Sequence, residues 1–302
     1  MRPLLVLTLC LSGVFSYGQS AVEYLDRGKS KFNLEDYRGA IADYTKAIEL
    51  DPKYAYTYLS RGAAKNGLQD YRGAIADCTK AIELDPKYEA AYYNRGTAKR
   101  NLEDYRGAIA DYTKAIELDP KYVAAYYNRG AAKFHLEEDR DAIADYTKAI
   151  ELDPKYVAAY YNRGTAKLNL EDYRGAIADY TKAIELDPKF AYAYYNRGNA
   201  KFNLEDYRGA IADYTKAIEL DPKYVYAYFN RGTAKHGLQD YRGAIQDFNK
   251  AIELDPKFAD AYRNRGNAKY VLQEKDGACL DWSKAGELGV KEAYDLIKKY
   301  CN

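Results

Sequence analysis

The feature that most constrains the fold of this 302-residue chain is a proline that returns every 34 residues. Seven of the eight prolines belong to the series, which runs Pro52, Pro86, Pro120, Pro154, Pro188, Pro222 and Pro256. A fixed period of this length is typical of chains made of repeated units, each of which contacts mainly its neighbours. The period therefore predicts an elongated array of small units, not one or two compact domains with separate cores.

The period divides most of the chain into eight repeats. They span 21–54, 55–88, 89–122, 123–156, 157–190, 191–224, 225–258 and 259–292. Residues 293–300 again have a helical pattern. We therefore expect residues 293–302 to form a C-terminal capping helix and tail that close the array.

The second half of each repeat has the pattern of an amphipathic helix. In the repeat 89–122, apolar residues recur at spacings of three and four from Tyr105 to Ile116, which places them on one helical face. Asp104 is positioned to cap the start of this helix. Pro120 ends it, because a proline disfavours helical backbone at the residue before it.

The first half of the same repeat, Glu89 to Leu102, is predicted to form a second helix. Gly96 lies on the face that this helix turns toward its partner, and the missing side chain allows a close approach of the two backbones. One such hairpin cannot bury its apolar faces alone. The sequence therefore predicts hairpins stacked in phase, with a core that continues along the array.

This pattern resembles a known repeat family. In the repeat 123–156 the characteristic aromatic, glycine, alanine, aromatic, alanine and proline positions are Tyr126, Gly130, Ala142, Tyr146, Ala149 and Pro154. A 34-residue helix–turn–helix unit with these residues resembles the tetratricopeptide repeat, and the resemblance covers residues 21–292. It implies an all-α fold, a right-handed α-solenoid superhelix of helix–turn–helix repeats, with a concave groove lined by the first helix of each repeat.

Two positions depart from the family pattern. Arginine precedes the glycine in all eight repeats, where the family often has leucine, and lysine stands three residues after it. The arginines are Arg27, Arg61, Arg95, Arg129, Arg163, Arg197, Arg231 and Arg265. Arg129 shares a helical stripe with Ala125 and Ala132, so we expect its stem to pack and its guanidinium to meet a carboxylate, either Asp145 or the equivalent residue of a neighbouring repeat.

Charge composition disfavours nucleic acid as a partner. The chain has 46 basic and 45 acidic side chains, and without the first eighteen residues there are 45 of each. Such a balanced surface lacks the basic stripe that phosphate backbones require. Binding to a membrane surface through a basic face is disfavoured for the same reason.

The first eighteen residues have the pattern of a secretory signal peptide. Arg2 supplies a positive charge, Leu4 to Val14 is an apolar stretch of suitable length, and Gly18 is a small residue at a suitable cleavage position. We expect cleavage after Gly18, a secreted or periplasmic location, and no membrane insertion after cleavage. Two alternatives stay open, an uncleaved membrane anchor and a lipoprotein signal.

Three cysteines remain after the predicted cleavage: Cys78, Cys279 and Cys301. Three is an odd number for a disulfide framework. Cys78 replaces a tyrosine on a predicted buried face, so a free thiol in the core is expected. Whether Cys279 and Cys301 pair is left open by the sequence.

Signals of catalysis, metal binding or a cofactor are absent from the sequence. The two histidines, His135 and His236, lie three repeats apart, and neither has cysteines or carboxylates at metal-ligand spacing. No serine has the context of a nucleophile, and no glycine-rich phosphate loop occurs. The recurring Glu-Leu-Asp-Pro segments are interpreted as solvated turns at helix ends. The sequence therefore predicts a non-catalytic protein with no cofactor and no metal.

The resemblance places two sets of side chains in the groove. Two residues before the glycine are six asparagines, one per repeat: Asn94, Asn128, Asn162, Asn196, Asn230 and Asn264. Next to them are Tyr93, Tyr127, Tyr161, Tyr195 and Phe229. A carboxamide offers both a donor and an acceptor, which matches a peptide group whatever its sequence. In the alternative interpretation, the asparagines brace neighbouring helices and the tyrosines pack between repeats.

We therefore expect a protein-binding module that holds an extended segment of an exported or envelope partner in its groove. A structural scaffold or spacer that uses its convex face or its ends, with an empty groove, is the alternative. A subunit that lends substrate recognition to a separate enzyme is a third possibility, and it requires a partner chain.

Overall fold

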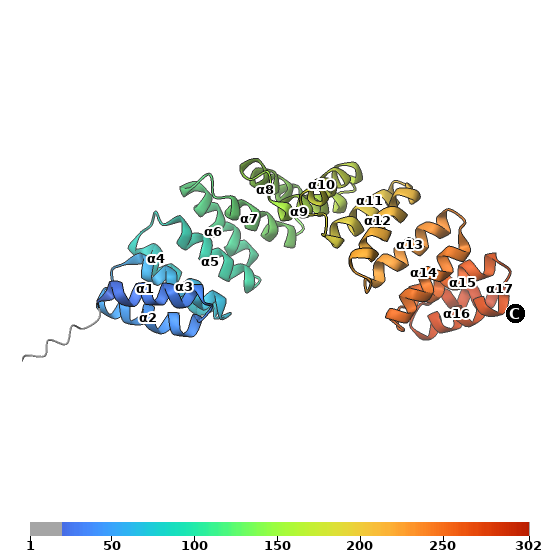
Figure 1. The fold of residues 1–302 in the computed structure, drawn as a ribbon, viewed down its shortest axis with the longest axis horizontal. Helices are drawn as coiled ribbons and strands as arrows, with labels where there is room; N and C mark the ends of the chain where they lie inside the picture. Colours follow the sequence, from blue (N-terminus) through green and yellow to red (C-terminus); the bar gives the residue numbers. More distant parts are fainter. Residues whose placement is uncertain (1–19, 302) are drawn as a thin grey trace, which may run out of the picture. The chain divides into compact units, whose positions relative to one another are not determined.

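The computed structural model describes residues 20–301, so the predicted signal peptide at residues 1–18 lies outside the described range. Within 20–301 the chain forms seventeen α-helices and no strand. Successive helices form pairs joined by short turns (Figure 1). The predicted all-α fold of stacked helix–turn–helix repeats is confirmed.

The helices divide between two compact units, an N-terminal unit that ends at Pro120 and a C-terminal unit that begins at Lys121. The first contains α1 (Ala21–Asn33), α2 (Tyr37–Leu50), α3 (Ala55–Gly67), α4 (Tyr71–Leu84), α5 (Glu89–Asn101) and α6 (Tyr105–Leu118). The second contains α7 (Val123–His135), α8 (Asp139–Leu152), α9 (Val157–Asn169), α10 (Tyr173–Leu186), α11 (Ala191–Asn203), α12 (Tyr207–Leu220), α13 (Val225–Gly237), α14 (Tyr241–Leu254), α15 (Ala259–Val271), α16 (Lys275–Glu287) and α17 (Glu292–Tyr300). Each odd-numbered helix from α1 to α15 begins at the first residue of a 34-residue repeat.

An aspartate caps the start of most second helices. Asp104 accepts a hydrogen bond from the backbone N–H of Gly107 at 2.9 Å, as its predicted capping role requires. A Cβ atom on Gly107 would lie 2.1 Å from Asp104 Oδ2, so the glycine makes room for the capping carboxylate. In the fourth repeat the cap position holds Glu138, which makes no capping hydrogen bond, and Asp141 replaces the glycine.

The turn between the two helices of each repeat contains one residue with left-handed backbone. In the third repeat this residue is Glu103, with φ of 62°. Its N–H donates to Arg100 O at 2.9 Å, and the N–H of Asp104 donates to Lys99 O at 2.9 Å. The full series is Glu35, Gln69, Glu103, Glu137, Glu171, Glu205, Gln239 and Gln273. Most turns of this kind use glycine or asparagine instead.

The core combines small residues with one large aromatic side chain in seven of the eight repeats. In the third repeat that side chain is Tyr112, which is fully buried against Gly96. A Cβ atom on Gly96 would lie 2.9 Å from the Tyr112 ring, so the predicted close approach of the two helices is confirmed. The equivalent residues in the other repeats are Tyr44, Cys78, Tyr146, Tyr180, Tyr214, Phe248 and Trp282.

Within each unit the first helices of successive repeats lie closer to one another than the second helices do. Each contacts the second helix of its own repeat, the second helix of the preceding repeat, and the neighbouring first helices. Among the described residues, no comparable contact joins one second helix to the next. In a curved stack the more closely spaced layer lies on the inside, so α7, α9, α11, α13 and α15 form what we call the inner layer of the C-terminal unit.

The last described helix packs against the second helix of the eighth repeat. α17 packs on α16, and Tyr300 contacts Trp282 with a distance of 6.0 Å between ring centroids. A disulfide joins Cys279, inside α16, to Cys301, the residue that follows α17, which settles the pairing that the sequence left open. Cys78 is free and buried, as expected, and burial raises the pKa of its thiol to about 12.

Candidate functional site

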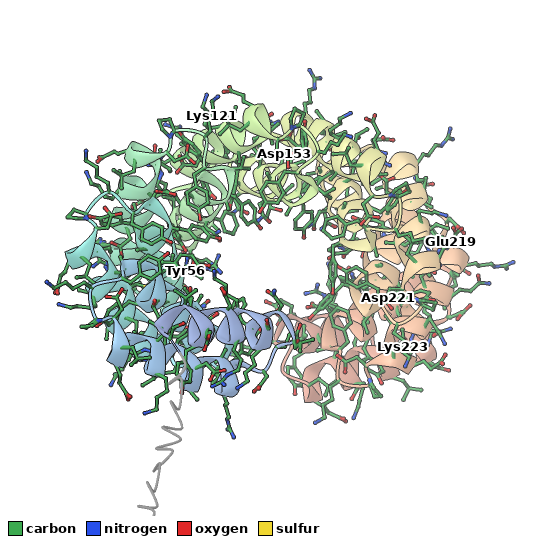
Figure 2. All side chains as sticks on the ribbon, turned by 60° about the vertical axis from the view of Figure 1, so that its left-hand side comes forward. Tyr56, Lys121, Asp153, Glu219, Asp221 and Lys223 are labelled. Carbon is green, nitrogen blue, oxygen red and sulfur yellow. A yellow bond between two sulfur atoms is a disulfide. The ribbon has the colours of Figure 1, made fainter. Side chains whose placement is uncertain are left out.

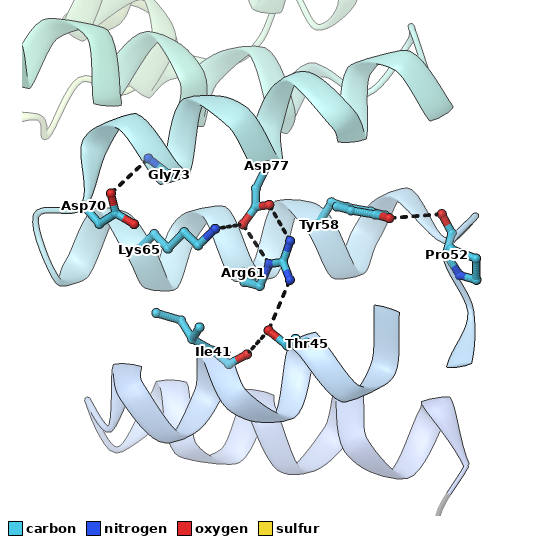
Figure 3. A network of polar contacts seen from close by, with 9 residues as sticks. All are labelled: Ile41, Thr45, Pro52, Tyr58, Arg61, Lys65, Asp70, Gly73 and Asp77. Atoms are coloured by element: carbon cyan, nitrogen blue, oxygen red, sulfur yellow. Dashed lines mark hydrogen bonds and ion pairs between the residues drawn. The ribbon is translucent and has the colours of Figure 1, made fainter. Parts of the chain in front are cut away.

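A buried charge cluster links the two helices of each repeat (Figure 3). In the second repeat Arg61 donates through Nε and Nη2 to the two carboxylate oxygens of Asp77, at 2.9 and 2.7 Å. Lys65 Nζ lies 2.7 Å from Asp77 Oδ2. Arg61 Nη1 donates to Thr45 Oγ1 of the preceding repeat at 3.1 Å. The cluster therefore holds together both the hairpin and the interface between repeats.

The pairing of one arginine and one lysine with a buried aspartate recurs in all eight repeats. The buried carboxylates are Asp43, Asp77, Asp111, Asp145, Asp179, Asp213, Asp247 and Asp281. The predicted partnership of Arg129 with Asp145 is confirmed by distances of 2.9 and 2.6 Å within one repeat. Lys133 also pairs with Asp145, at 2.8 Å, which sequence reasoning missed. The signal was present, since Lys133 lies one helical turn after Arg129.

Two pKa shifts reflect the strength of these contacts. Hydrogen bonding from Arg27 lowers the pKa of Asp43 below its ordinary value, against the opposing effect of burial. The hydrogen bond to Asp111 raises the pKa of Arg95. The arginines are thus engaged with their own repeats, and we assign them a structural role.

Three of the predicted groove asparagines brace the preceding repeat. Asn162 donates to Tyr127 Oη at 2.9 Å. Asn196 donates to Tyr161 Oη at 2.9 Å, and the next asparagine along the array makes the same contact at 3.0 Å. The amide donors of these three residues therefore make hydrogen bonds within the protein. This is the arrangement of the alternative interpretation, in which the asparagines brace neighbouring helices.

The other three asparagines are placed differently. Asn94 donates to Ala90 O at 2.8 Å and Asn128 donates to Ala124 O at 2.9 Å, in each case within the same helix. Asn128 is also buried. Asn264 uses its carbonyl oxygen, which accepts from Arg263 Nε at 3.4 Å. The six carboxamides thus do not form one uniform row of free groups.

The aromatic residues beside them pack between repeats. The ring of Tyr161 lies 5.8 Å from that of Tyr180 and 4.8 Å from that of Phe190. The same arrangement holds for Tyr127, Tyr195 and Phe229, while Tyr93 contacts Tyr112 at 5.8 Å. Burial raises the pKa of Tyr161 and of Tyr195, so both phenols stay neutral at physiological pH.

The inner layer of the C-terminal unit contains a pocket of about 390 Å³ over α9, α11 and α13. Its lining residues are Leu168, Asn199, Phe202, Asn203, Tyr214, Phe229, Asn230 and Thr233. Apolar side chains and carboxamides therefore face the same opening. Phe229 and Asn230 are predicted site residues, whereas Leu168 and Phe202 occupy a position four residues after the glycine that varies from repeat to repeat.

Asn199 is a central member of this pocket that sequence reasoning missed. Its Oδ1 accepts from Tyr214 Oη at 2.9 Å and from Asn230 Nδ2 at 3.0 Å. Its own amide donates to Asn196 Oδ1 at 3.3 Å. A network of this kind fixes the orientation of each carboxamide. The only signal in the sequence is that asparagine replaces the threonine or alanine of most repeats at this position.

Smaller pockets flank it along the same layer. One of about 170 Å³ lies between α7 and α9 and includes Phe134 and Asn162. Another, of about 180 Å³, lies between α13 and α15 and includes His236 and Asn264. In the N-terminal unit, a pocket of about 400 Å³ is lined by residues that include Tyr56, Leu59 and Asn94.

Residues 20–301 contain no group of three or more histidine, cysteine, aspartate or glutamate residues arranged to hold a metal ion. His135 and His236 line different pockets. The acidic turns are exposed, as Glu219 and Asp221 illustrate in Figure 2, and Asp221 Oδ1 accepts from the N–H of Lys223 at 3.0 Å. Among the described helices, none is both long and apolar enough to cross a membrane.

Comparison with known families identifies the repeat along most of the chain. The description "Tetratricopeptide repeat" matches residues 89–122, 123–156, 157–190 and 191–224, and further descriptions of the same repeat match 28–69, 55–88, 213–246 and 234–273. A search of curated proteins finds no match.

Solved structures share the architecture. MamA protein is 31% identical, with a TM-score of 0.54 over 57% of this chain and 94% of that one. YrrB, described as a TPR protein with an unusual peptide-binding site, is 27% identical, with a TM-score of 0.56 over 61% of this chain and 95% of that one. The C-terminal part of a TPR repeat-containing protein from Cytophaga hutchinsonii is 20% identical, with a TM-score of 0.68 over 80% and 98% of the two chains, and shows likeness of fold alone.

The comparisons, the 34-residue phase of the helices and the buried glycine–aromatic contact of seven of the eight hairpins agree on one assignment. The chain belongs to the tetratricopeptide repeat family, whose repeats generally form non-catalytic scaffolds for protein–protein interaction.

Proposed function

We propose that the inner layer of the C-terminal unit binds an extended peptide segment of a partner protein. The observation that carries the proposal is the pocket over α9, α11 and α13, where Leu168, Phe202 and Phe229 face the same opening as Asn199 and Asn230. Apolar pockets with a few fixed polar groups are the usual form of ligand sites. Such a surface suits a peptide that offers apolar side chains and backbone amides together.

The carboxamides have a defined part in this binding. The Nδ2 groups of Asn162 and Asn230 are used by tyrosines, whereas their Oδ1 atoms accept no hydrogen bond within residues 20–301. Both residues line pockets of the inner layer. Their carbonyl oxygens are therefore available to accept from the backbone N–H groups of a bound segment.

The free energies of hydrogen bonding, side-chain burial and peptide ordering together favour modest affinity for the peptide. Each peptide hydrogen bond contributes a net ~1 kcal/mol, while ordering the peptide backbone costs about 1–2 kcal/mol per residue. Burial of a large apolar side chain contributes about 1.5–3 kcal/mol, so such side chains in the ligand supply most of the binding free energy. Because the pocket lining is uncharged, we expect weak dependence on salt.

Selection of peptides from a random library, followed by fluorescence anisotropy with a labelled peptide, tests the proposal. The decisive variant is Leu168→Arg with Phe202→Arg. Arg100 occupies the equivalent position of α5, so the fold of the repeat accommodates arginine there. We expect the variant to keep its helical circular dichroism and thermal midpoint while its affinity falls at least about tenfold, which is ~1.4 kcal/mol.

A matched control places the same charges on the outer helices. Ala178 and Ala212 are exposed on α10 and α12, and the equivalent residue of α14 is the polar Gln246. Ala178→Arg with Ala212→Arg is expected to leave binding unchanged. If the outer pair abolishes binding and the inner pair does not, the chain acts as a scaffold through its outer face and the groove proposal is wrong.

We also propose that the chain is exported and that its partner is an exported or envelope protein. The signal-like pattern of residues 1–18 motivates this proposal, and the disulfide between Cys279 and Cys301 supports it, since such bonds persist in oxidising compartments. The intact mass of the protein from its native source is expected to correspond to a chain that begins at Gln19. A mature chain that still starts at Met1 would contradict cleavage.

A further inference from the structure

Two tyrosines of the inner layer leave more than half of their surface open to solvent. Tyr192 on α11 is 56% exposed, and Tyr226 on α13 is 58% exposed. Each is the second residue of its repeat, a position that holds alanine or aspartate in the other repeats of the C-terminal unit. Each ring is held edge-on by one aromatic neighbour, Tyr192 by Tyr224 at 5.4 Å and Tyr226 by Phe258 at 5.5 Å. The two rings are therefore fixed in position and still accessible.

Both tyrosines lie on the helix face that lines the pocket of the proposed function. Tyr226 precedes Asn230 by four residues and Thr233 by seven, a spacing that places all three on one face of α13. Tyr192 likewise precedes Asn199 by seven residues on α11. Asn199, Asn230 and Thr233 all line the pocket. A segment that crosses the inner layer beside this pocket therefore passes the two rings.

A contact in the N-terminal unit shows what covers a ring at this position of the repeat. Tyr56 is the second residue of its repeat, and the ammonium of Lys29 lies 4.8 Å from the centroid of its ring. Lys29 is the ninth residue of the preceding repeat, and its Nζ also lies 3.6 Å from Asp26 Oδ1. Tyr56 is correspondingly less exposed than Tyr192 or Tyr226. The ring face at this position thus accepts a cation.

The C-terminal unit has no lysine at the corresponding places. The ninth residues of the repeats that precede Tyr192 and Tyr226 are Thr165 and Asn199. Both are uncharged, and both already make hydrogen bonds within the protein. Among the described residues, no ammonium or guanidinium group covers either ring. The ring faces that a lysine covers at Tyr56 are therefore open at these two tyrosines.

Negative charge lies close to one of the open rings. Asp221 is exposed, and its Oδ1 accepts from the backbone N–H of Lys223 at 3.0 Å. Burial raises the pKa of Tyr224, and Tyr192 and Asp221 are among the neighbours that raise it further. Asp221 is thus near the ring that contacts Tyr192. A cation placed over Tyr192 is therefore attracted both by the ring and by a carboxylate.

We propose that the open faces of Tyr192 and Tyr226 bind two basic side chains, lysine or arginine, of the bound segment. Each cation takes the place over its ring that Lys29 takes over Tyr56. Because α11 and α13 contact each other, their axes lie about 8–10 Å apart, which corresponds to about three residues of an extended chain. The inference rests on the proposed function, since the segment must cross the inner layer, and it adds a preference for positive charge to the apolar one.

Other side chains match these rings less well. An acidic side chain would meet the negative face of each ring and, at Tyr192, the nearby carboxylate of Asp221. An apolar side chain would gain burial on the rings but no electrostatic attraction. A basic side chain combines the two, because its apolar stem packs while its charged end stays over the ring.

Fluorescence anisotropy on the 19–302 protein tests the proposal. The probe is the labelled peptide Leu-Lys-Ala-Ala-Lys-Leu, and its counterparts replace both lysines with norleucine, trimethyllysine or glutamate. Norleucine keeps the apolar stem without the charge, and trimethyllysine keeps the charge without a hydrogen-bond donor. We expect the lysine and trimethyllysine probes to bind about tenfold more tightly than the other two. A lysine probe that binds no better than the norleucine probe, or a trimethyllysine probe that binds no better, would overturn the proposal.

Two double variants separate the rings from the rest of the groove. Tyr192→Ala with Tyr226→Ala has a precedent in the chain, since Ala124 and Ala158 occupy the same position. We expect it to keep its helical circular dichroism and to bind the lysine and norleucine probes equally, whereas Tyr192→Phe with Tyr226→Phe retains the preference for lysine. The control Tyr294→Ala removes a tyrosine of α17 that is 57% exposed and should change neither affinity. A preference for lysine that survives the loss of both rings would contradict the assignment.

Thr165→Lys supplies the missing internal cation. Lys29 stands at the same position beside the buried Tyr44, so the repeat accommodates lysine there. The new ammonium is expected to cover Tyr192 and to weaken binding of the lysine probe about threefold, with no effect on the norleucine probe. In a protein that also carries Tyr192→Ala, the added lysine should have no effect. An equal loss in both proteins would contradict the role of Tyr192.

The two proposals can fail separately. If selected peptides bind through Leu168 and Phe202 and gain nothing from basic residues, the ring assignment is wrong and the groove function stands. If the lysine probe binds through Tyr192 and Tyr226 but Leu168→Arg with Phe202→Arg leaves the binding of selected peptides intact, the ring assignment stands and the groove function is wrong.

Discussion

At the residue scale, the buried aspartate of each repeat is the group on which most contacts converge. Asp179 is 4% exposed, and it pairs with Arg163 at 2.6 Å and Lys167 at 2.7 Å. Arg163 also donates to Thr147 of the preceding repeat at 3.0 Å. One carboxylate therefore neutralises two largely buried cations, and its loss affects a hairpin and an interface together.

Asp179→Ala is expected to lower the free energy of unfolding by about 3 kcal/mol, because it leaves two buried cations without a counter-charge. Urea unfolding followed by circular dichroism measures the change. The control is Glu185→Ala, which removes an exposed ion pair with Lys182 and should cost less than ~0.5 kcal/mol. If the two variants are equally mild, the cluster does not stabilise the fold in the way described here.

Part of this cluster could be predicted from the sequence. The position of Arg129 on an apolar stripe required a carboxylate partner, and Asp145 was a candidate because it lies on the facing helix. The sharing of Asp145 with Lys133 was missed, although Lys133 lies one helical turn after Arg129, because a lysine at a helix surface is usually solvated. The contact depends on the distance between the two helices at Gly130, and that distance cannot be read from the sequence.

At the element scale, the turn between the helices of a hairpin holds a residue other than glycine in left-handed backbone, which costs conformational free energy. Glu103 has φ of 62°, and a side chain with a Cβ atom is disfavoured in that region. The two backbone hydrogen bonds around it end the first helix and orient the second. The position was not identified from the sequence because glutamate is not a usual residue for left-handed backbone.

Glu103→Gly is expected to raise the free energy of unfolding by about 0.5–1 kcal/mol, because glycine adopts this backbone without steric cost. Thermal and urea unfolding measure the gain. Glu103→Ala is the control: alanine retains the Cβ atom, so its stability should stay close to that of the original protein. A glycine variant no more stable than the alanine variant would show that the turn is not strained.

For the candidate site, the sequence could predict which residues lie on the inner layer but not which hydrogen bonds they make. The resemblance to the family placed Phe229 and Asn230 on the inner layer, where both line a pocket. The hydrogen bonds of the asparagines could not be predicted, because they depend on the distance from Asn162 to a hydroxyl group on the preceding repeat. The role of Asn199 depends on the same interface.

At the scale of the whole molecule, the interfaces between successive repeats are equivalent, so a whole repeat can be removed and its neighbours can make the same contacts. Arg197 contacts Thr181 and Asn196 contacts Tyr161, both in the preceding repeat. If the repeat 157–190 is removed, Thr147 and Tyr127 stand in the corresponding places. Stability in such arrays is approximately a sum of repeat and interface contributions.

Deletion of residues 157–190 is therefore expected to give a folded protein with unchanged helicity per residue and lower resistance to urea. Circular dichroism and urea unfolding measure both quantities. Deletion of residues 157–173 is the control, since it removes half a repeat and breaks the phase of the hairpins. Equal damage from the two deletions would contradict equivalent interfaces.

The direction of the arginine–threonine bond bears on the synthesis of the chain. Arg61, Arg163 and Arg231 each reach back to a side chain that the ribosome has already added. The hydroxyl group that each of these arginines binds is therefore already present, so this bond requires no residue later in the chain. Because the bond always points toward the amino terminus, hairpins can be added one after another to a folded stack as the chain emerges from a ribosome or a translocation channel.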